Sequence, residues 1–149
     1  MPNYRRYRVL GGAYFFTVNL LERCSNNLLI NHVESLRTVV RETRKRWPFQ
    51  IDAWVVLPDH LHCVWTLPEG DDDNSNRWRL IKQGFSKALP MTERRSAVRV
   101  ARGERGARNA VFGIMSSGTA AHVDYCHINP AKQGLVGRVS NWPCSSFHR

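Results

Sequence analysis

The pattern of hydrophobic and polar positions in the first half of the chain predicts three strands. Aromatic and β-branched residues fill positions 13–20, which favours a buried strand. Residues 50–57 and 60–67 are two further apolar runs, and Pro58-Asp59 between them is typical of a turn. These two runs therefore predict a β-hairpin.

The spacing of apolar residues also predicts three helices. Residues 31–47 and 76–89 each place their apolar side chains on one helical face. Asn31 is expected to cap the first helix, because an asparagine side chain accepts a backbone N–H at a helix start. Residues 120–129 predict a third helix. We expect Pro130 to end it, since proline lacks the N–H that a helix needs.

The order of these elements predicts a ferredoxin-like fold. Strand, helix, strand, strand and helix follow one another, and a strand within residues 109–119 would complete the β-α-β-β-α-β arrangement. The fold class is then α/β in the α+β sense, with an antiparallel sheet, helices packed on one face and a further helix appended. The 149 residues contain no linker and no internal repeat, so we expect a single domain over residues 1–149.

The charge of the chain favours a polyanionic partner. It carries 22 lysines and arginines against 12 aspartates and glutamates, a formal net charge of +10. Nucleic acid fits this charge better than an anionic membrane, because no basic amphipathic helix with a bulky apolar face is present. No apolar run reaches the roughly 18 to 20 residues that span a bilayer, so we expect a cytoplasmic, nucleoid-associated protein without a membrane partner.

Two groups of basic residues are candidates for phosphate contacts. In the first eight residues, arginines alternate with tyrosines, a combination that suits phosphate contact and base stacking. Further basic residues surround the apolar stripe of the predicted helix 76–89. The candidates are Arg5, Arg6, Arg8, Arg77, Arg79 and Lys82. A solvated arm and a solvated helix face are the alternative interpretations.

His60 and His62 are candidate metal ligands. Side chains at i and i+2 of a strand project from the same face, so this pair can hold one divalent ion. Two ligands bind weakly, and a third has to come from elsewhere in the fold. The alternative is a pair of histidines packed on a sheet surface. In the acidic loop 69–73 we expect solvated or capping carboxylates and no metal.

Tyr125 is a candidate nucleophile. In the predicted helix 120–129, Tyr125 and Asn129 are four residues apart and lie on one face. An amide oxygen at Asn129 would complete a metal site beside the tyrosine. A free tyrosine has a pKa of roughly 10 and is a poor nucleophile at neutral pH, so a divalent ion has to polarise the scissile phosphate. By residue type alone, a packed core aromatic is the favoured interpretation of this position.

Several motifs together resemble the REP-associated tyrosine transposases, relatives of the single-tyrosine HUH transposases of bacterial insertion sequences. Around the candidate site the matching motifs are Pro58-Asp59-His60-Leu61-His62, His122-Val123-Asp124-Tyr125 and Ile128-Asn129-Pro130. Elsewhere they are Arg5-Arg6-Tyr7, Gly11-Gly12, residues 15–20, residues 53–57, Trp65-Thr66-Leu67-Pro68, Lys132, Gly134-Leu135-Val136 and Trp142-Pro143. The resemblance covers nearly the whole chain.

This resemblance implies a ferredoxin-like HUH domain that binds single-stranded or hairpin DNA of the repetitive extragenic palindrome type. It implies cleavage and rejoining of single-stranded DNA through a 5′-phosphotyrosine intermediate, with Mg²⁺ or Mn²⁺ as the cofactor. The metal-binding pair corresponds to His60 and His62, and the nucleophile to Tyr125. Asn129 corresponds to the third ligand. A monomer and a dimer are both compatible with the sequence.

Residues 107–119 depart from the family pattern. The segment lacks the aromatic residues and the histidine that the family has there, and its glycines and serines have poor strand propensity. Codons chosen to fit residues 109–119 encode a family-like sequence one frame over, which motivates the hypothesis of a frameshifted remnant. The nucleotide sequence of the gene tests this, because incompatible codons would exclude it.

The departure leaves alternatives to the transposase interpretation. A catalytically impaired, sequence-specific DNA-binding protein is the first, because catalysis requires the nucleophile to be placed to within about an ångström. A small hydrolase that uses His60, His62 and a metal-bound water is the second. The shortage of further strong ligands counts against the hydrolase.

Overall fold

The computed structural model describes residues 9–20, 26–89, 97–103, 109–111 and 119–146. Its centre is a four-stranded antiparallel sheet with the strand order β2-β3-β1-β4. The strands are β1 (Ala13–Asn19), β2 (Gln50–Val56), β3 (His60–Thr66) and β4 (Asn109–Val111). This order and the βαββαβ succession of its elements confirm the predicted ferredoxin-like arrangement.

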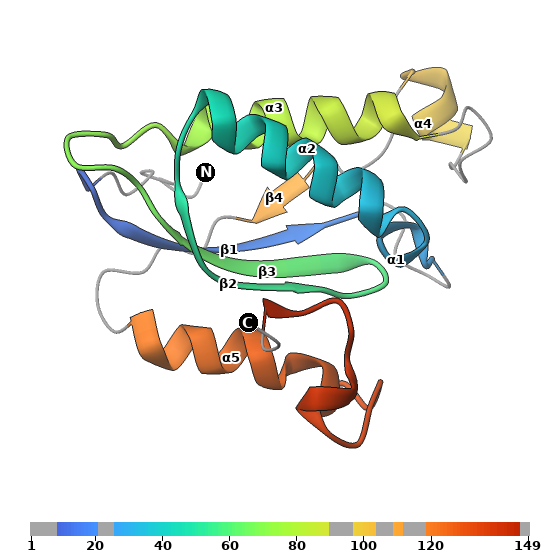
Figure 1. Ribbon diagram of the computed structural model, residues 1–149. Helices are drawn as coiled ribbons and strands as arrows, with labels where there is room; N and C mark the ends of the chain where they lie inside the picture. The colour runs from blue at the N-terminus through green and yellow to red at the C-terminus, as the bar shows by residue number, and fades with distance from the viewer. Residues whose placement is uncertain (1–8, 21–25, 90–96, 104–108, 112–118, 147–149) are drawn as a thin grey trace, which may run out of the picture.

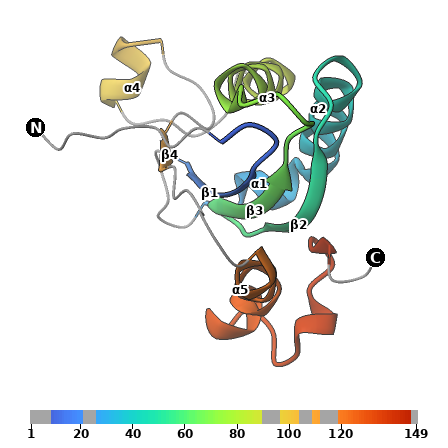
Figure 2. The same cartoon turned by 90° about the vertical axis from the view of Figure 1, so that its left-hand side faces the viewer.

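Helices cover both faces of the sheet. In chain order they are α1 (Leu28–Asn31), α2 (Val33–Arg46), α3 (Asn74–Ala88), α4 (Ala97–Ala101) and α5 (Thr119–Lys132), followed by the short 3₁₀ helix η1 (Val139–Asn141). Figure 1 and Figure 2 show α2 and α3 side by side on one face, as the fold class predicts, and α5 on the opposite face. The appended helix therefore creates a second layer, which has its own interface with the sheet.

Successive side chains of β1 and β3 point alternately to the two faces of the sheet, so each strand contributes to both layers. Tyr14, Phe16 and Val18 are buried towards α2 and α3, in a cluster that also holds Trp65 and Trp78. The ring centroids of Trp65 and Trp78 are 4.7 Å apart, so the aromatic side chains form one continuous core. The intervening residues of β1 and β3 face α5. This alternation decides which side chains of the sheet can contact α5.

The two helices of the first layer approach each other closely at Gly84. A Cβ atom at this position would lie 2.8 Å from Cγ1 of Val39 on α2, which is closer than carbon atoms pack. Glycine in a helix interior is otherwise unfavourable. Its presence in α3 is therefore explained by the contact with α2.

Some boundaries of the helices differ from those predicted. The helix predicted for residues 31–47 is interrupted at His32, which follows α1 and precedes α2, so Asn31 ends α1 and caps nothing. The prediction that Pro130 ends the last helix is also wrong, because α5 continues to Lys132. The missing N–H of a proline removes only one bond so close to the helix end, and the amide of Gln133 still reaches the carbonyl of Asn129 at 2.9 Å.

Arg77 contradicts its assignment as a phosphate contact. Its side chain is fully buried at the start of α3, and its guanidinium group donates to the carboxylate of Asp71 and to backbone carbonyls of Trp47, Pro48 and Asp73. An arginine with its donors used in this way has none to offer a DNA phosphate. Arg77 lies on the predicted helix, but the acidic loop folds over its side chain and removes it from solvent.

The acidic loop supplies a helix cap, as predicted, and also an ion pair that the sequence did not predict. Asp73 caps α3, because its side chain accepts the backbone N–H of Asn76 at 3.0 Å. Asp71 pairs with Arg77, with 2.7 Å between Oδ2 and Nη2. The pKa of the Asp71 carboxyl lies below its ordinary value, mainly because of the hydrogen bond from Arg77. These carboxylates hold the loop to the helix.

Candidate active site

The two histidines lie together on the sheet face that α5 covers. His60 and His62 project from the same side of β3, and the centroids of their rings are 5.1 Å apart. Both side chains are buried. The register of β1 against β3 places Thr17 opposite His62, so the neighbouring strand supplies the first groups around the pair.

In each histidine, Nδ1 has a hydrogen-bond partner from the protein. Nδ1 of His60 lies 2.6 Å from Oδ1 of Asp59, and Nδ1 of His62 lies 2.8 Å from Oγ1 of Thr17. A partner at Nδ1 fixes the ring orientation. Both imidazoles are therefore held in a manner that suits Nε2 as a metal ligand.

Tyr125 on α5 faces this pair across the layer. Its ring centroid lies 5.4 Å from that of His62 and 5.8 Å from that of Phe15, in edge-to-face geometry with both rings. The residue keeps 38% of its surface exposed, so the tyrosine is open to a substrate while its ring is packed. The ammonium of Lys132 lies 5.5 Å from the ring centroid. Tyr125 is thus not a closed core aromatic.

Asn129 lies one helical turn after the tyrosine and is 2% exposed. Its Oδ1 accepts a hydrogen bond of 2.7 Å from Nε2 of Gln133, which also lies 3.2 Å from Nε2 of His60. The two amide hydrogens of Gln133 therefore bridge the asparagine and the histidine. This bridge shows that the side chains of Asn129 and His60 converge on one point.

Gln133 was missed by the sequence reasoning. Its position four residues after Asn129 and eight after Tyr125 is the signal that was available, since all three lie on one helix face. Because the helix was predicted to end at Pro130, Gln133 was not expected to lie on the same face as Tyr125 and Asn129. The actual helix continues, and the residue directly after its last turn reaches back to the site.

The arrangement of donors fits a divalent ion. His60, His62 and Asn129 offer two imidazoles and one carboxamide oxygen, a mixed nitrogen and oxygen set of the kind that binds first-row divalent metals. Among the described residues there is no group of three or more histidines, cysteines, aspartates or glutamates able to hold a metal. An ion at this site would therefore depend on the amide at Asn129 as well as on His60 and His62.

Cys126 does not compete with Tyr125 as a nucleophile. Burial raises the pKa of its thiol to about 12, so the thiol stays protonated at neutral pH. Its side chain packs with Ala53, Val55 and Val64 in the small apolar cluster between α5 and the sheet. This packing anchors the helix one residue after the tyrosine and so helps to fix the direction of Tyr125.

Comparison with curated proteins shows extended similarity to one group. The chain is 46% identical over 149 residues to a REP-associated tyrosine transposase of Escherichia coli, and the match covers all of this chain and 84% of that protein. It is 36% identical over 154 aligned positions to a putative REP-associated tyrosine transposase of Haemophilus influenzae, with 87% of that protein covered. The chain belongs to the REP-associated tyrosine transposases. No protein-family profile matches it.

A solved structure agrees with this membership. The structure of a REP-associated tyrosine transposase bound to a REP hairpin superposes with a TM-score of 0.82 at 43% identity, over all of this chain and 84% of that one. The similarity extends to the fold as a whole, and it confirms the HUH-type fold class that the motifs implied.

Two of the basic candidates, Arg79 and Lys82, are separated from Tyr125 by the sheet. Arg79 is exposed on α3, and Lys82 is half-buried on the same helix, in the layer on the other side of the sheet from α5. Arg5, Arg6 and Arg8 lie outside the described residues. None of the helices in the described part of the chain is long and apolar enough to cross a membrane.

Proposed function

We propose that this chain binds a DNA hairpin of the REP type and cleaves and rejoins single-stranded DNA through Tyr125. The observation that carries the proposal is the placement of a solvent-accessible tyrosine ring 5.4 Å from the His62 ring, in a layer that also presents His60 and Asn129. The membership in the transposase family and the hairpin bound to the structural relative support the same substrate class.

The cleavage step is a transesterification. The phenolic oxygen of Tyr125 forms a bond to phosphorus, and the bond from phosphorus to the 3′ oxygen breaks. The phenol loses its proton and the leaving 3′ oxygen gains one, so the products are a 5′-phosphotyrosine and a free 3′-OH. The number of phosphodiester bonds is unchanged, which allows a 3′-OH to attack the phosphotyrosine and rejoin the strand.

Residues around Tyr125 orient the nucleophile. Phe15 and His62 pack edge-to-face against its ring and restrict the rotation of the side chain. The ammonium of Lys132, 5.5 Å from the ring centroid, stabilises negative charge that develops on the phenol during attack. A fixed orientation of the phenolic oxygen of Tyr125 toward the scissile phosphate lowers the entropic cost of the attack, which is a major source of rate enhancement.

His60, His62 and Asn129 are the residues that would hold Mg²⁺ or Mn²⁺. When bound, such an ion polarises the scissile phosphate and neutralises charge in the transition state. Asp59 and Thr17 keep the two imidazoles in the orientation that this role needs, through hydrogen bonds of 2.6 and 2.8 Å to their Nδ1 atoms.

A second candidate function is DNA binding without cleavage. The observation that favours it is that β4, which pairs with the end of β1, lies inside the divergent segment 107–119, whose glycines and serines have poor strand propensity. This strand precedes the helix that carries Tyr125, so a weak strand reduces the precision with which the tyrosine is placed. Both functions require hairpin DNA, and only the cleaving enzyme forms a covalent 5′-phosphotyrosine with it.

A covalent-adduct assay separates the candidates. A labelled single-stranded REP hairpin is incubated with the protein and Mg²⁺ or Mn²⁺, and adducts are resolved on denaturing gels. We expect an adduct that Tyr125→Phe abolishes, while hairpin affinity is retained. Tyr14→Phe is the matched control, because it removes a hydroxyl that bonds only to the backbone of Val9 on the opposite face.

Each other outcome identifies a different activity. Hairpin binding without any adduct favours the binding module. Cleaved product that never carries a tyrosine adduct favours a metal-dependent hydrolase. An adduct that persists in Tyr125→Phe would remove Tyr125 as the nucleophile.

A further inference from the structure

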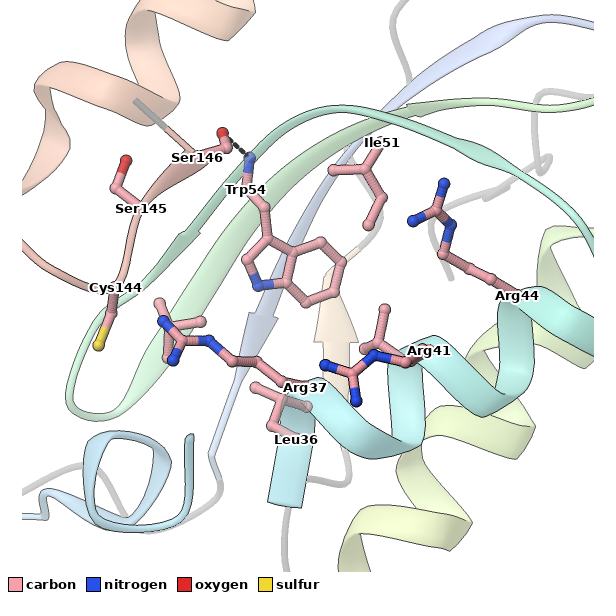
Figure 3. A pocket seen from close by; sticks show the side chains of 11 residues that line it. Leu36, Arg37, Arg41, Arg44, Ile51, Trp54, Cys144, Ser145 and Ser146 are labelled. Atoms are coloured by element: carbon pink, nitrogen blue, oxygen red, sulfur yellow. Dashed lines mark hydrogen bonds between the residues drawn. The ribbon is translucent and has the colours of Figure 1, made fainter. Parts of the chain in front are cut away.

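A cleft of about 300 Å³ lies between α2 and the edge strand β2, and the proposed cleavage chemistry does not use it. Figure 3 shows the indole of Trp54 at its centre, with arginines from α2 on one side and Ser145 and Ser146 on the other. Its volume is at the lower end of the range of small-ligand sites. The indole faces α3, since its ring centroid is 6.3 Å from that of Trp78. The cleft is therefore on the other face of the sheet from Tyr125.

Residues 144–146 form one wall of the cleft, which is fixed to β2. The backbone N–H of Val56 donates to the carbonyl of Cys144 at 2.8 Å, and the N–H of Trp54 donates to Oγ of Ser146 at 2.8 Å. Oγ of Ser146 also lies 2.9 Å from Nε2 of His127 on α5. These bonds join the cleft wall both to the sheet and to the helix that carries the tyrosine.

The opposite wall is positively charged. Arg37, Arg41 and Arg44 lie at i, i+4 and i+7 of α2, so they line one side of the helix. None of the described residues that line the cleft is acidic. Arg37 forms an ion pair with Glu34, and Arg44 donates from Nε to the carbonyl of Phe49 at 3.0 Å. Arg41 is exposed and extends from the middle of the row.

The floor of the cleft is aromatic and aliphatic. It consists of Trp54, which is half-buried, together with Ile51, Leu36 and Val40. A flat apolar surface flanked by guanidinium groups is complementary to a nucleotide, whose base can stack on an indole while its phosphate accepts from arginine. A purely apolar ligand would leave the arginines unused, and a small inorganic anion would leave the indole uncovered.

We infer that this cleft binds one unpaired nucleotide of the single-stranded DNA that flanks the hairpin. The base stacks on Trp54, and Arg41 with Arg37 holds the adjoining phosphate. This inference rests on the proposed function, because it assumes a hairpin substrate. A free nucleotide offers the same chemistry, so the experiment has to separate the two sources.

The test compares two hairpins with the same stem and loop, one carrying a single-stranded flank and one blunt. Arg41→Ala is expected to weaken binding of the flanked hairpin about tenfold and to leave binding of the blunt hairpin unchanged. Arg46→Ala is the matched control, since Arg46 is an exposed arginine of the same helix that does not line the cleft. It should affect both hairpins alike and only slightly.

A crosslinking measurement supplies a second, independent readout. A halogenated pyrimidine in the flank, irradiated in the complex, is expected to crosslink to the peptide that contains Trp54. A mononucleotide such as dTMP is expected not to compete at concentrations that saturate the flanked hairpin. Competition at equal concentration would assign the cleft to free nucleotides and overturn the DNA assignment.

The failures are distinguishable. Wild-type protein that binds neither hairpin overturns the proposed function, and the inference with it. Wild-type protein that binds both hairpins equally, or an Arg41→Ala variant that behaves as Arg46→Ala does, overturns the inference alone. A crosslink to a peptide without Trp54 also overturns it.

Discussion

Replacing Arg77 with methionine tests the reassignment of this residue from DNA contact to structural support. The guanidinium group donates at 2.7 Å to the carbonyls of Pro48 and Asp73 and to Oδ2 of Asp71, with two longer bonds of 3.3 Å. Methionine keeps most of the apolar volume but leaves these acceptors without donors. The Asp71 side chain is 28% exposed and can be hydrated once its partner is gone, whereas a buried carbonyl left without a donor costs about 1 to 3 kcal/mol. For a chain of this length, that corresponds to a fall in Tm of roughly 2 to 12 °C.

Chemical denaturation monitored by far-UV circular dichroism and tryptophan fluorescence measures the change. Arg79→Met is the matched control, because Arg79 is exposed and makes only two bonds of 3.4 Å to Asn76. Its free energy of unfolding should stay within about 0.5 kcal/mol of wild type. Equal stability of the two variants would refute the reasoning. A stable Arg77→Met variant with reduced hairpin affinity would restore the phosphate contact.

Three further predictions follow from individual contacts. The hydrogen bond from Arg77 lowers the pKa of the Asp71 carboxyl in the folded protein. The stability that ionised Asp71 contributes is therefore fully present above the pKa of about 3.9 that an aspartate has in the unfolded chain. It is lost as the pH falls through the lower pKa of the folded state. Denaturation at pH 6 and pH 3 should therefore show a larger loss of stability in wild type than in Arg77→Met, and an equal loss would contradict this. Gln133→Ala removes the amide that contacts Oδ1 of Asn129 and Nε2 of His60, the atoms proposed to bind the metal. Calorimetry should therefore show Mn²⁺ binding about 5- to 30-fold tighter, whereas weaker binding would indicate that Gln133 is itself a ligand. Gly84→Ala gains helix propensity of about 1 kcal/mol but sets a carbon 2.8 Å from Cγ1 of Val39, so thermal melts should show net destabilisation of about 1 kcal/mol. A variant as stable as wild type would mean that α2 can move away.

Much of the fold could be predicted because its strands and helices are encoded by local patterns. The aromatic run in β1 and the hairpin of β2 and β3 are visible in the sequence, and their order restricts the topology to few choices. The histidine pair could be predicted for the same reason, because strand alternation alone puts His60 and His62 on one face. The helix ends were less predictable, since α5 continues two residues past Pro130, where the missing N–H removes only one bond.

The exposure of the basic residues could not be predicted from their spacing. Arg77 and Arg79 are two residues apart on α3 and carry the same charge, yet one is fully buried and the other is exposed. The difference arises because the loop before α3 and the residues after α2 converge on Arg77 from separate parts of the sequence. Helical periodicity describes only the face on which a residue lies and not what covers that face.

The sequence by itself determined the succession of the first three strands and the helices, the positive charge, the i and i+2 histidines and the i and i+4 pair of Tyr125 and Asn129. Each of these depends on backbone geometry over a few residues or on composition. Only the tertiary structure decided that α5 packs on the histidine face, that Gln133 bridges Asn129 and His60, and that the arginines of α2 line a cleft against Trp54. These contacts join residues up to about a hundred positions apart, and they form because separate elements bury their apolar faces on one sheet.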